Sequence, residues 1–165
     1  MQAVEPCHII LCDLQGVGHA LDPQKQGAFF IDEIKRNYPE KFVVAYTGGG
    51  LNQAITRDAM QSSDVFLRKD SMIEDWRDKL DTLIVKLLDP FQVWERQRIA
   101  LVHKGVDTLV ILKLEDSFVR SIIAKEPVEN SRFANNLKDT KINGDVRAVL
   151  QSLVASGLYS LLTGT

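Results

Sequence analysis

Several features that define other classes of protein are scarce in this 165-residue chain. It has only two cysteines and three histidines, and these residues form no metal-binding spacing. Cys7 and Cys12 lie on one apolar run, where their spacing puts them on opposite faces of a strand. They cannot pair with each other there. We therefore predict two buried, reduced thiols.

Long hydrophobic runs and a strong charge of one sign are also missing. No apolar run approaches the about 18 residues of a membrane span. The first ten residues, MQAVEPCHII, lack the basic and apolar regions of a signal peptide. The net charge of −2 gives no overall field that attracts nucleic acid or anionic lipid. The sequence thus predicts a cytoplasmic protein with no membrane association, and it argues against nucleic acid as a partner.

What the first half contains is an alternation of short apolar runs and helical patterns. The runs are β-branched or aromatic and apolar on both faces, as in parallel strands covered on both sides. They are CHIILC (7–12), KFVVAY (41–46) and DVFLR (64–68). Helical patterns follow at 27–37, at 51–61 and from a capping box at Ser71 and Glu74 to Asp89. Residues 1–89 are therefore expected to form an α/β domain with a parallel sheet of about three strands.

The second half has the pattern of a C-terminal all-helical extension. Residues 90–126 suit two helices, at 91–104 and 107–125, although TLVILKL within the second could also form a strand. Residues 127–145 are polar and are expected to be a linker. Residues 146–165 contain an amphipathic helix whose apolar face must be covered by this chain or by a second copy. A homodimer through this helical half is therefore possible.

Each predicted strand delivers one polar side chain at its C-terminal end: Asp13, Thr47 and Lys69. In open parallel sheets, ligands bind at this edge. A carboxylate, a hydroxyl and an ammonium suit phosphoryl transfer to the carboxylate, with Asp13 as the nucleophile. Transfer of this kind depends on positioning and charge neutralisation, and normally uses Mg²⁺.

The same stretches resemble the later part of a response-regulator receiver domain. IILCD, GAFFIDEIKRNYP, VVAYTG and DVFLRK follow one another in the order and near the spacing of that family. The resemblance implies a flavodoxin-like, receiver-like fold with Asp13 as phosphoacceptor, assisted by Thr47 and Lys69. Phe66 would be the switch aromatic. It further implies a signalling protein in a phosphorelay rather than an enzyme, with a sensor histidine kinase or another phosphodonor as partner.

Two departures from the family concern the metal site and the turn after the lysine. Receivers begin with a strand that ends in paired acidic residues, which hold Mg²⁺, but only 12 residues precede Asp13. A metal would then have Asp13 and the backbone carbonyl of Gln15. Asp70 also replaces the proline that usually follows the lysine. The chain is expected to be either a piece of a longer receiver or a reduced relative that signals without ordinary phosphorylation.

Two alternative functions remain open from the sequence. IILCDLQGVG also resembles the first motif of haloacid-dehalogenase-like phosphatases, but Gln15 stands where that family has its acid/base Asp. A transcriptional regulator with a DNA-binding helical half is the other alternative. Its recognition helix would be TLVILKLEDSF, which is apolar and acidic where a groove-reading helix should be polar and basic.

Overall fold

The structure, a computed structural model, describes residues 4, 7–50, 54–127, 130–155 and 158–164. The chain divides into two compact units. The sheet unit contains Ile9–Asn37 and Lys41–Val85, and the helical unit contains Met1–His8, Tyr38–Glu40 and Lys86–Thr165. Each unit is described by itself below.

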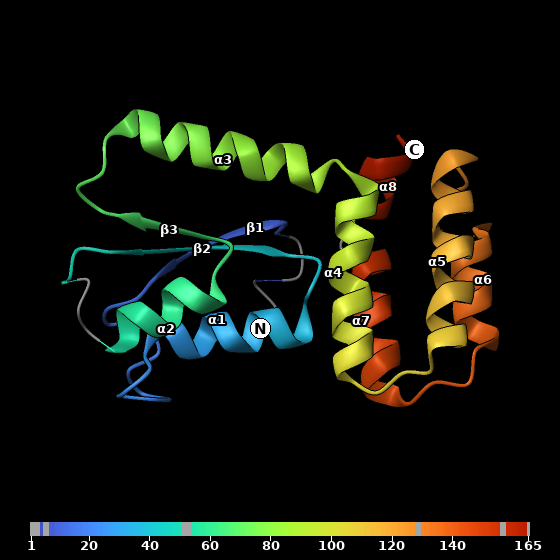
Figure 1. Cartoon of the computed structure of the whole chain (residues 1–165), viewed down its shortest axis with the longest axis horizontal. Helices are drawn as coiled ribbons and strands as arrows, with labels where there is room; N and C mark the ends of the chain where they lie inside the picture. The colour runs from blue at the N-terminus through green and yellow to red at the C-terminus, as the bar shows by residue number, and fades with distance from the viewer. Residues whose placement is uncertain (1–3, 5–6, 51–53, 128–129, 156–157, 165) are drawn as a thin grey trace. The chain divides into compact units, whose positions relative to one another are not determined.

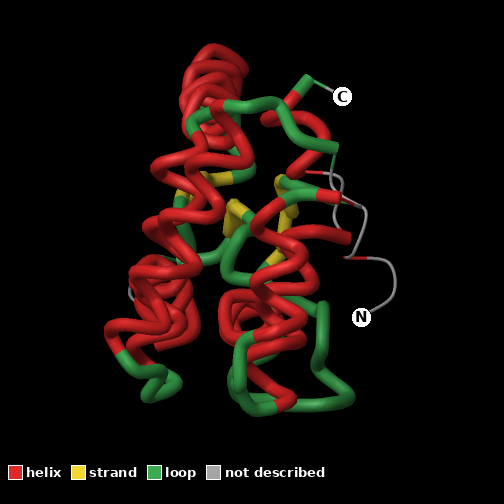
Figure 2. The backbone as a smooth tube through the Cα atoms, turned by 90° about the vertical axis from the view of Figure 1, so that its right-hand side faces the viewer, coloured by secondary structure: helices red, strands yellow, loops and turns green. Residues whose placement is uncertain are grey.

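The sheet unit is built on three parallel strands, which lie side by side in Figures 1 and 2. They are β1 (Ile9–Asp13), β2 (Phe42–Thr47) and β3 (Val65–Arg68), in the order β1-β2-β3. Leu11 pairs with Val44, and Val44 pairs in turn with Val65. Central strand β2 is buried over almost its whole length because both of its faces are covered. The predicted α/β class with a three-stranded parallel sheet is confirmed.

Three helices belong to this sheet. They are α1 (Gly27–Asn37), α2 (Ala54–Ser62) and α3 (Ile73–Leu87). Helix α1 has the predicted bounds, whereas residues 51–53 at the predicted start of the next helix lie outside the described residues. Figure 1 shows α1 and α2 on one side of the sheet and α3 on the other. Buried Ile31 and Ile34 anchor α1, and Trp76 anchors α3 by an edge contact with Tyr46 at 5.7 Å.

The predicted capping box before α3 is wrong. The hydroxyl of Ser71 accepts the backbone N–H of Arg68 at 3.3 Å, and the helix begins two residues later, at Ile73. Ser71 therefore closes the turn that follows β3. Lys69 is part of this turn, between the end of β3 and the start of α3.

The helical unit contains five helices in its described residues. They are α4 (Pro90–His103), α5 (Thr108–Ile123), α6 (Arg132–Asp139), α7 (Gly144–Ala155) and α8 (Leu158–Thr163). Asp89, Asp107 and Ser131 cap α4, α5 and α6 by accepting backbone N–H groups of the first turns. TLVILKL is helical throughout, because Asp107 starts a helix whose apolar residues recur at helical spacing. The strand alternative for this segment is therefore wrong.

Helix α6 corrects the prediction that 127–145 is a polar linker. Its sequence is mostly polar, but Phe133 and Leu137 are four residues apart and both are buried. Phe133 packs in an aromatic cluster with Trp94 and Phe118, whose rings stack at 5.2 Å. The last predicted helix begins at Gly144, and its described residues form α7 and α8.

A short segment between α1 and β2 is part of the helical unit. The backbone carbonyl of Pro39 accepts the Nε–H of Arg96 at 2.8 Å. Buried Glu40 accepts hydrogen bonds at Oε2 from Gln97 Nε2, at 3.3 Å, and from the hydroxyl of Ser152, at 3.1 Å. The segment thus joins α4 and α7 through hydrogen bonds.

The two cysteines differ in environment. Cys12 is buried, and its thiol lies 3.4 Å from the carbonyl oxygen of Gly27, whereas Cys7 is exposed. The prediction of a buried thiol is confirmed for Cys12 and is wrong for Cys7. Among the described residues, no helix combines the length and the apolar character needed to cross a bilayer.

Candidate functional site at the carboxyl edge of the sheet

The three predicted site residues lie at the same edge of the sheet. Asp13 and Thr47 are the last residues of β1 and β2, and Lys69 follows the last residue of β3. Backbone hydrogen bonds continue beyond the strands here: Leu14 donates to Tyr46 at 3.1 Å, and Lys69 donates to Thr47 at 2.9 Å. These bonds fix the spacing of the three strand ends.

Asp13 and Lys69 form an ion pair over this edge. The distance between Lys69 Nζ and Asp13 Oδ2 is 2.6 Å, although the residues are 56 positions apart in sequence. The hydrogen bond from Lys69 to Asp13 and the charge of that carboxylate raise the pKa of the Lys69 ammonium. The ammonium also lies 5.6 Å from the centre of the Tyr46 ring, where a cation is attracted to the aromatic face.

Thr47 lies between the two charged residues in strand order and is buried. Its hydroxyl oxygen accepts the backbone N–H of Gly49 at 3.0 Å. A hydroxyl can accept one hydrogen bond and donate another at the same time. The site therefore contains an anionic acceptor, a hydroxyl and an ammonium at one edge of the sheet.

The loop after β1 contributes Gln15, for which the sequence predicted a role of the backbone carbonyl but none of the side chain. The backbone N–H of Gln15 donates to Asp13 Oδ1 at 3.3 Å. The side-chain amide of Gln15 lies against Gly49, where a Cβ atom would approach its Nε2 to 2.4 Å. Gln15 thus links the loop after β1 to the glycine loop after β2. The three consecutive glycines at 48–50 are the sequence signal for such a close approach.

Gly27, the first residue of α1, contacts the backbone of Asp13 and Leu14 at the end of β1. Its N–H donates to the carbonyl of Leu14 at 3.2 Å. A Cβ atom at this position would lie 2.2 Å from the carbonyl oxygen of Asp13 and 2.7 Å from the Leu14 Cα. Only glycine allows α1 to approach the end of β1 so closely.

The donor set does not fit a Mg²⁺ ion. Within the part of the chain that the structure describes, no group of three or more His, Cys, Asp or Glu side chains is placed to hold a metal. Asp13 is the one carboxylate among the three strand-end residues, and Gln15, the other predicted ligand, directs its backbone N–H at Asp13. Mg²⁺ requires near-octahedral oxygen coordination, usually with more than one acidic ligand at such sites.

Phe66, the predicted switch residue, lies on β3 opposite Ala45 and is half-buried. It is thus three residues before Lys69, on the strand that positions the ammonium. The structure places the residue in the predicted strand, and its role as a switch stays a prediction.

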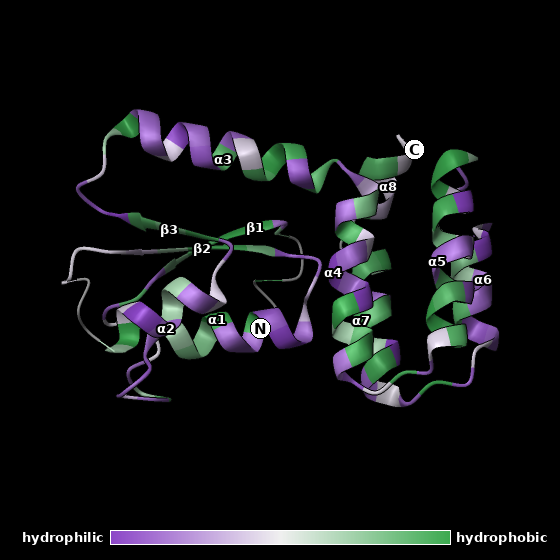
Figure 3. Cartoon of the chain, viewed as in Figure 1, coloured by the Kyte–Doolittle hydropathy of each residue, from purple (hydrophilic) through white to green (hydrophobic). Residues whose placement is uncertain are grey.

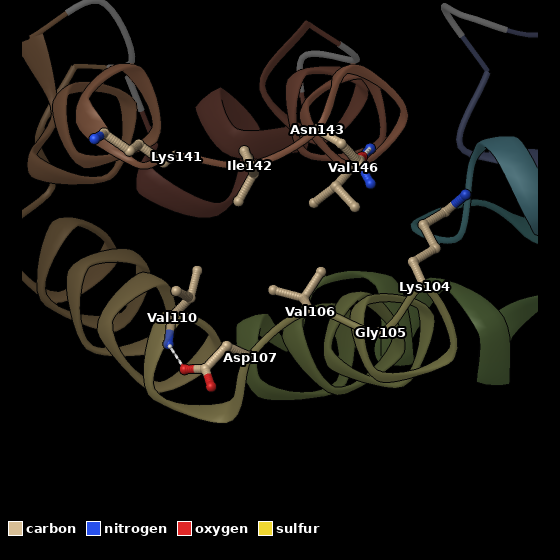
Figure 4. A pocket seen from close by; sticks show the side chains of 9 residues that line it. All are labelled: Lys104, Gly105, Val106, Asp107, Val110, Lys141, Ile142, Asn143 and Val146. Atoms are coloured by element: carbon tan, nitrogen blue, oxygen red, sulfur yellow. Dashed lines mark hydrogen bonds between the residues drawn. The ribbon is translucent and has the colours of Figure 1, made fainter.

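A separate pocket lies within the helical unit (Figure 4). Its volume is about 190 Å³, and it is formed by the turn between α4 and α5 and the turn between α6 and α7. Val106 from the first turn and Val110 from α5 face Ile142 from the second turn and Val146 from α7. None of the three strand-end residues lines this pocket.

No family model, no curated protein and no solved structure in the comparisons matches this chain.

Proposed function

We propose that the chain is a response-regulator-like signalling protein in which Asp13 accepts a phosphoryl group. The observation that supports this proposal is the ion pair between Asp13 and Lys69, with Thr47 on the strand between them. Three chemically distinct side chains from three successive parallel strands meet at the edge where such sheets bind ligands. If the three residues were only polar strand ends at the surface, they would not need to contact one another.

The proposed step is a displacement at phosphorus. An oxygen of the Asp13 carboxylate forms a bond to the phosphorus of an acyl phosphate or a phosphohistidine. The bond between phosphorus and the donor breaks, and the donor leaves with the electron pair. The Lys69 ammonium offsets the charge of the phosphoryl oxygens, and the Thr47 hydroxyl donates a hydrogen bond to one of them. In a signalling protein, the new contacts of Thr47 and Lys69 with the phosphoryl group would shift the loop after Thr47 and the side chain of Phe66.

No step of this proposal uses Mg²⁺, since the described residues include no group of three or more His, Cys, Asp or Glu side chains placed to hold a metal. The partner would be a sensor histidine kinase or another phosphodonor, and the protein would act in the cytoplasm. The chain itself would be a switch rather than an enzyme.

A second candidate is a receiver-like module that signals without phosphorylation. The charge of the resting site favours it: one ammonium already neutralises one carboxylate at 2.6 Å. Phosphorylation would convert the Asp13 carboxylate, with one negative charge, into an acyl phosphate with up to about two at neutral pH. Lys69 is the one cation among the three strand-end residues, so it would offset only part of that charge. In this candidate the ion pair is a permanent feature of the sheet edge.

Mass spectrometry of the intact protein distinguishes the two candidates. The full chain is incubated with acetyl phosphate, with and without Mg²⁺. A phosphoacceptor gains about 80 Da, and Asp13→Asn removes this gain. Asp70→Asn is the matched control, because Asp70 is an exposed carboxylate just beyond the same strand ends and pairs with Arg68. If no adduct forms in either buffer, the phosphoacceptor proposal fails and the second candidate stands.

A further inference from the structure

Helix α5 presents an apolar face to solvent as well as one to the core of the helical unit. Its core face contains Ile111, Leu114 and Phe118. On the opposite side, Leu112 and Ile123 are each more than half exposed. Asp116 and Arg120 lie between them and form an exposed ion pair at 2.8 Å. Figure 3 shows hydrophobic and hydrophilic bands alternating along this helix.

Four of the exposed residues of α5 are arranged symmetrically about the middle of the helix, and exposed Leu109 extends the apolar part of the same face toward the start of the helix. Leu112 and Ile123 are equidistant from position 117.5, and Asp116 and Arg120 are equidistant from position 118. The two centres differ by half a residue, which is about 0.75 Å along a helix. Reversing the helix end for end therefore exchanges Leu112 with Ile123 and Asp116 with Arg120.

Helix α4 repeats this order on its exposed side. Phe91 and Val102 are more than half exposed, and Glu95 and Arg98 lie between them, 4.0 Å apart. Both pairs are equidistant from position 96.5. Arg98 also lies 3.6 Å from Glu115 of α5, so this side of α4 borders α5. Four exposed residues of each helix thus follow one order, apolar, acidic, basic, apolar, and Ile99 of α4 and Leu109 of α5 add further exposed apolar side chains.

A surface of this kind is complementary to itself. In a twofold dimer the same patch is contributed by both copies. When two α5 helices pack antiparallel, Leu112 of one copy meets Ile123 of the other, and Asp116 meets Arg120. Large apolar residues that are exposed together on one surface mark protein interaction sites. Charges of opposite sign at matching positions select the partner.

We infer that the exposed faces of α4 and α5 form the interface of a homodimer, in which α5 packs antiparallel against α5 of a second copy. The occupant is a second copy because the Asp116–Arg120 pair fits its own reverse, while exposed Lys113 lies at the edge of this face. A partner of one charge sign would meet like charges on this face, since each helix presents both signs. This inference is independent of whether Asp13 is phosphorylated.

Charge reversal tests the antiparallel pairing. The full chain should sediment at twice the mass of one chain at micromolar concentrations. Asp116→Arg places two basic residues on each α5, and Arg120→Asp places two acidic residues there. Each variant alone should therefore be monomeric. A mixture of the two variants should form a heterodimer, because every basic position then faces an acidic one.

A second pair of variants tests the apolar contacts. Leu112→Lys should weaken the dimer by at least tenfold in dissociation constant. Val85→Lys is the matched control, since Val85 is an exposed apolar residue on α3, outside the proposed interface. Circular dichroism checks that each variant is folded. The inference is overturned if the parent chain is monomeric at all concentrations, or if the mixed charge variants fail to associate.

Discussion

The ammonium of Lys35 on α1 lies 2.8 Å from both carboxylate oxygens of Asp64, the residue before β3. Asp64 Oδ2 also accepts the backbone N–H of Val43 on β2 at 2.8 Å. One carboxylate therefore ties a helix and a strand to the start of the next strand. Its side chain is mostly buried, which reduces screening by solvent.

Asp64→Asn should destabilise the protein by roughly 1–3 kcal/mol, because it leaves the Lys35 ammonium without its carboxylate in a partly buried place. Urea unfolding followed by circular dichroism measures this change. Asp70→Asn provides the comparison. Its pair with Arg68 is exposed and screened by solvent, so its loss should change the stability much less. Equal effects of the two substitutions would contradict the proposed role of Asp64.

Gly27→Ala should destabilise the sheet unit, since the new Cβ atom would lie 2.2 Å from the carbonyl oxygen of Asp13. Backbone cannot move aside as the end of a side chain can, so the loss should be about 1–3 kcal/mol or more. Gly144→Ala is the control: it also lies at the start of a helix, and a Cβ atom there meets no atom within 4 Å. Thermal unfolding of both variants makes the comparison. A Gly27→Ala protein as stable as the parent would show that α1 does not approach β1 this closely.

Only one of the two cysteines should react in the folded protein. Burial, with a further effect of the Asp13 charge, raises the pKa of the Cys12 thiol to about 11. The thiolate is the reactive form, so Cys12 is almost fully protonated at neutral pH. Cys7 is exposed. An aromatic disulfide reagent that releases a coloured thiolate, used at pH 7.5, should label one thiol per native chain and two per chain in denaturant.

Cys7→Ser should abolish the native labelling, and Cys12→Ser should leave it unchanged. Rapid labelling of the Cys7→Ser variant before denaturation would contradict the buried position of Cys12.

Protonation of Glu126 should make the helical unit less stable in acid. Its carboxylate accepts the backbone N–H of Arg132 and the hydroxyl of Ser121, and the pKa of Glu126 is lowered, chiefly by the first of these bonds. A lowered folded-state pKa gives a stabilising contribution that is fully present above the unfolded value, about 4.3. This contribution is lost as the pH falls through the lower folded-state pKa.

Unfolding by urea between pH 3 and pH 7 tests this dependence. The difference in stability between the parent chain and Glu126→Gln should be largest near pH 7 and should shrink below about pH 4. A difference that is constant over this range would rule out the titration of Glu126 as its cause.

The sequence predicts the sheet well because its signals are local. The bounds of α1 follow from apolar residues at helical spacing between Gly27 and Pro39. The meeting of Asp13 and Lys69 follows from a general rule, since successive parallel strands bring their carboxyl ends to one edge. Neither prediction depends on the conformation of a loop.

The features that the sequence did not predict depend on tertiary contacts. Helix α6 has only Phe133 and Leu137 as large apolar residues, and its helical state depends on burying both. Ser131 caps the start of α6 and is a local signal for a helix, but the mostly polar composition of the segment led to the prediction of a linker. The contact of the Gln15 side chain with Gly49 depends on how two loops fold over the sheet edge. No periodic pattern records such a contact.

The position of Tyr38–Glu40 in the helical unit has a consequence for how the protein can be divided. The unit boundaries fall after His8, Asn37, Glu40 and Val85, so the backbone passes from one unit to the other four times. A fragment that starts at Lys86 would lack Glu40 and would leave the buried Gln97 amide without that acceptor. Cleavage of one peptide bond therefore releases neither unit whole. Neither unit can therefore be expressed whole as one continuous segment of the chain.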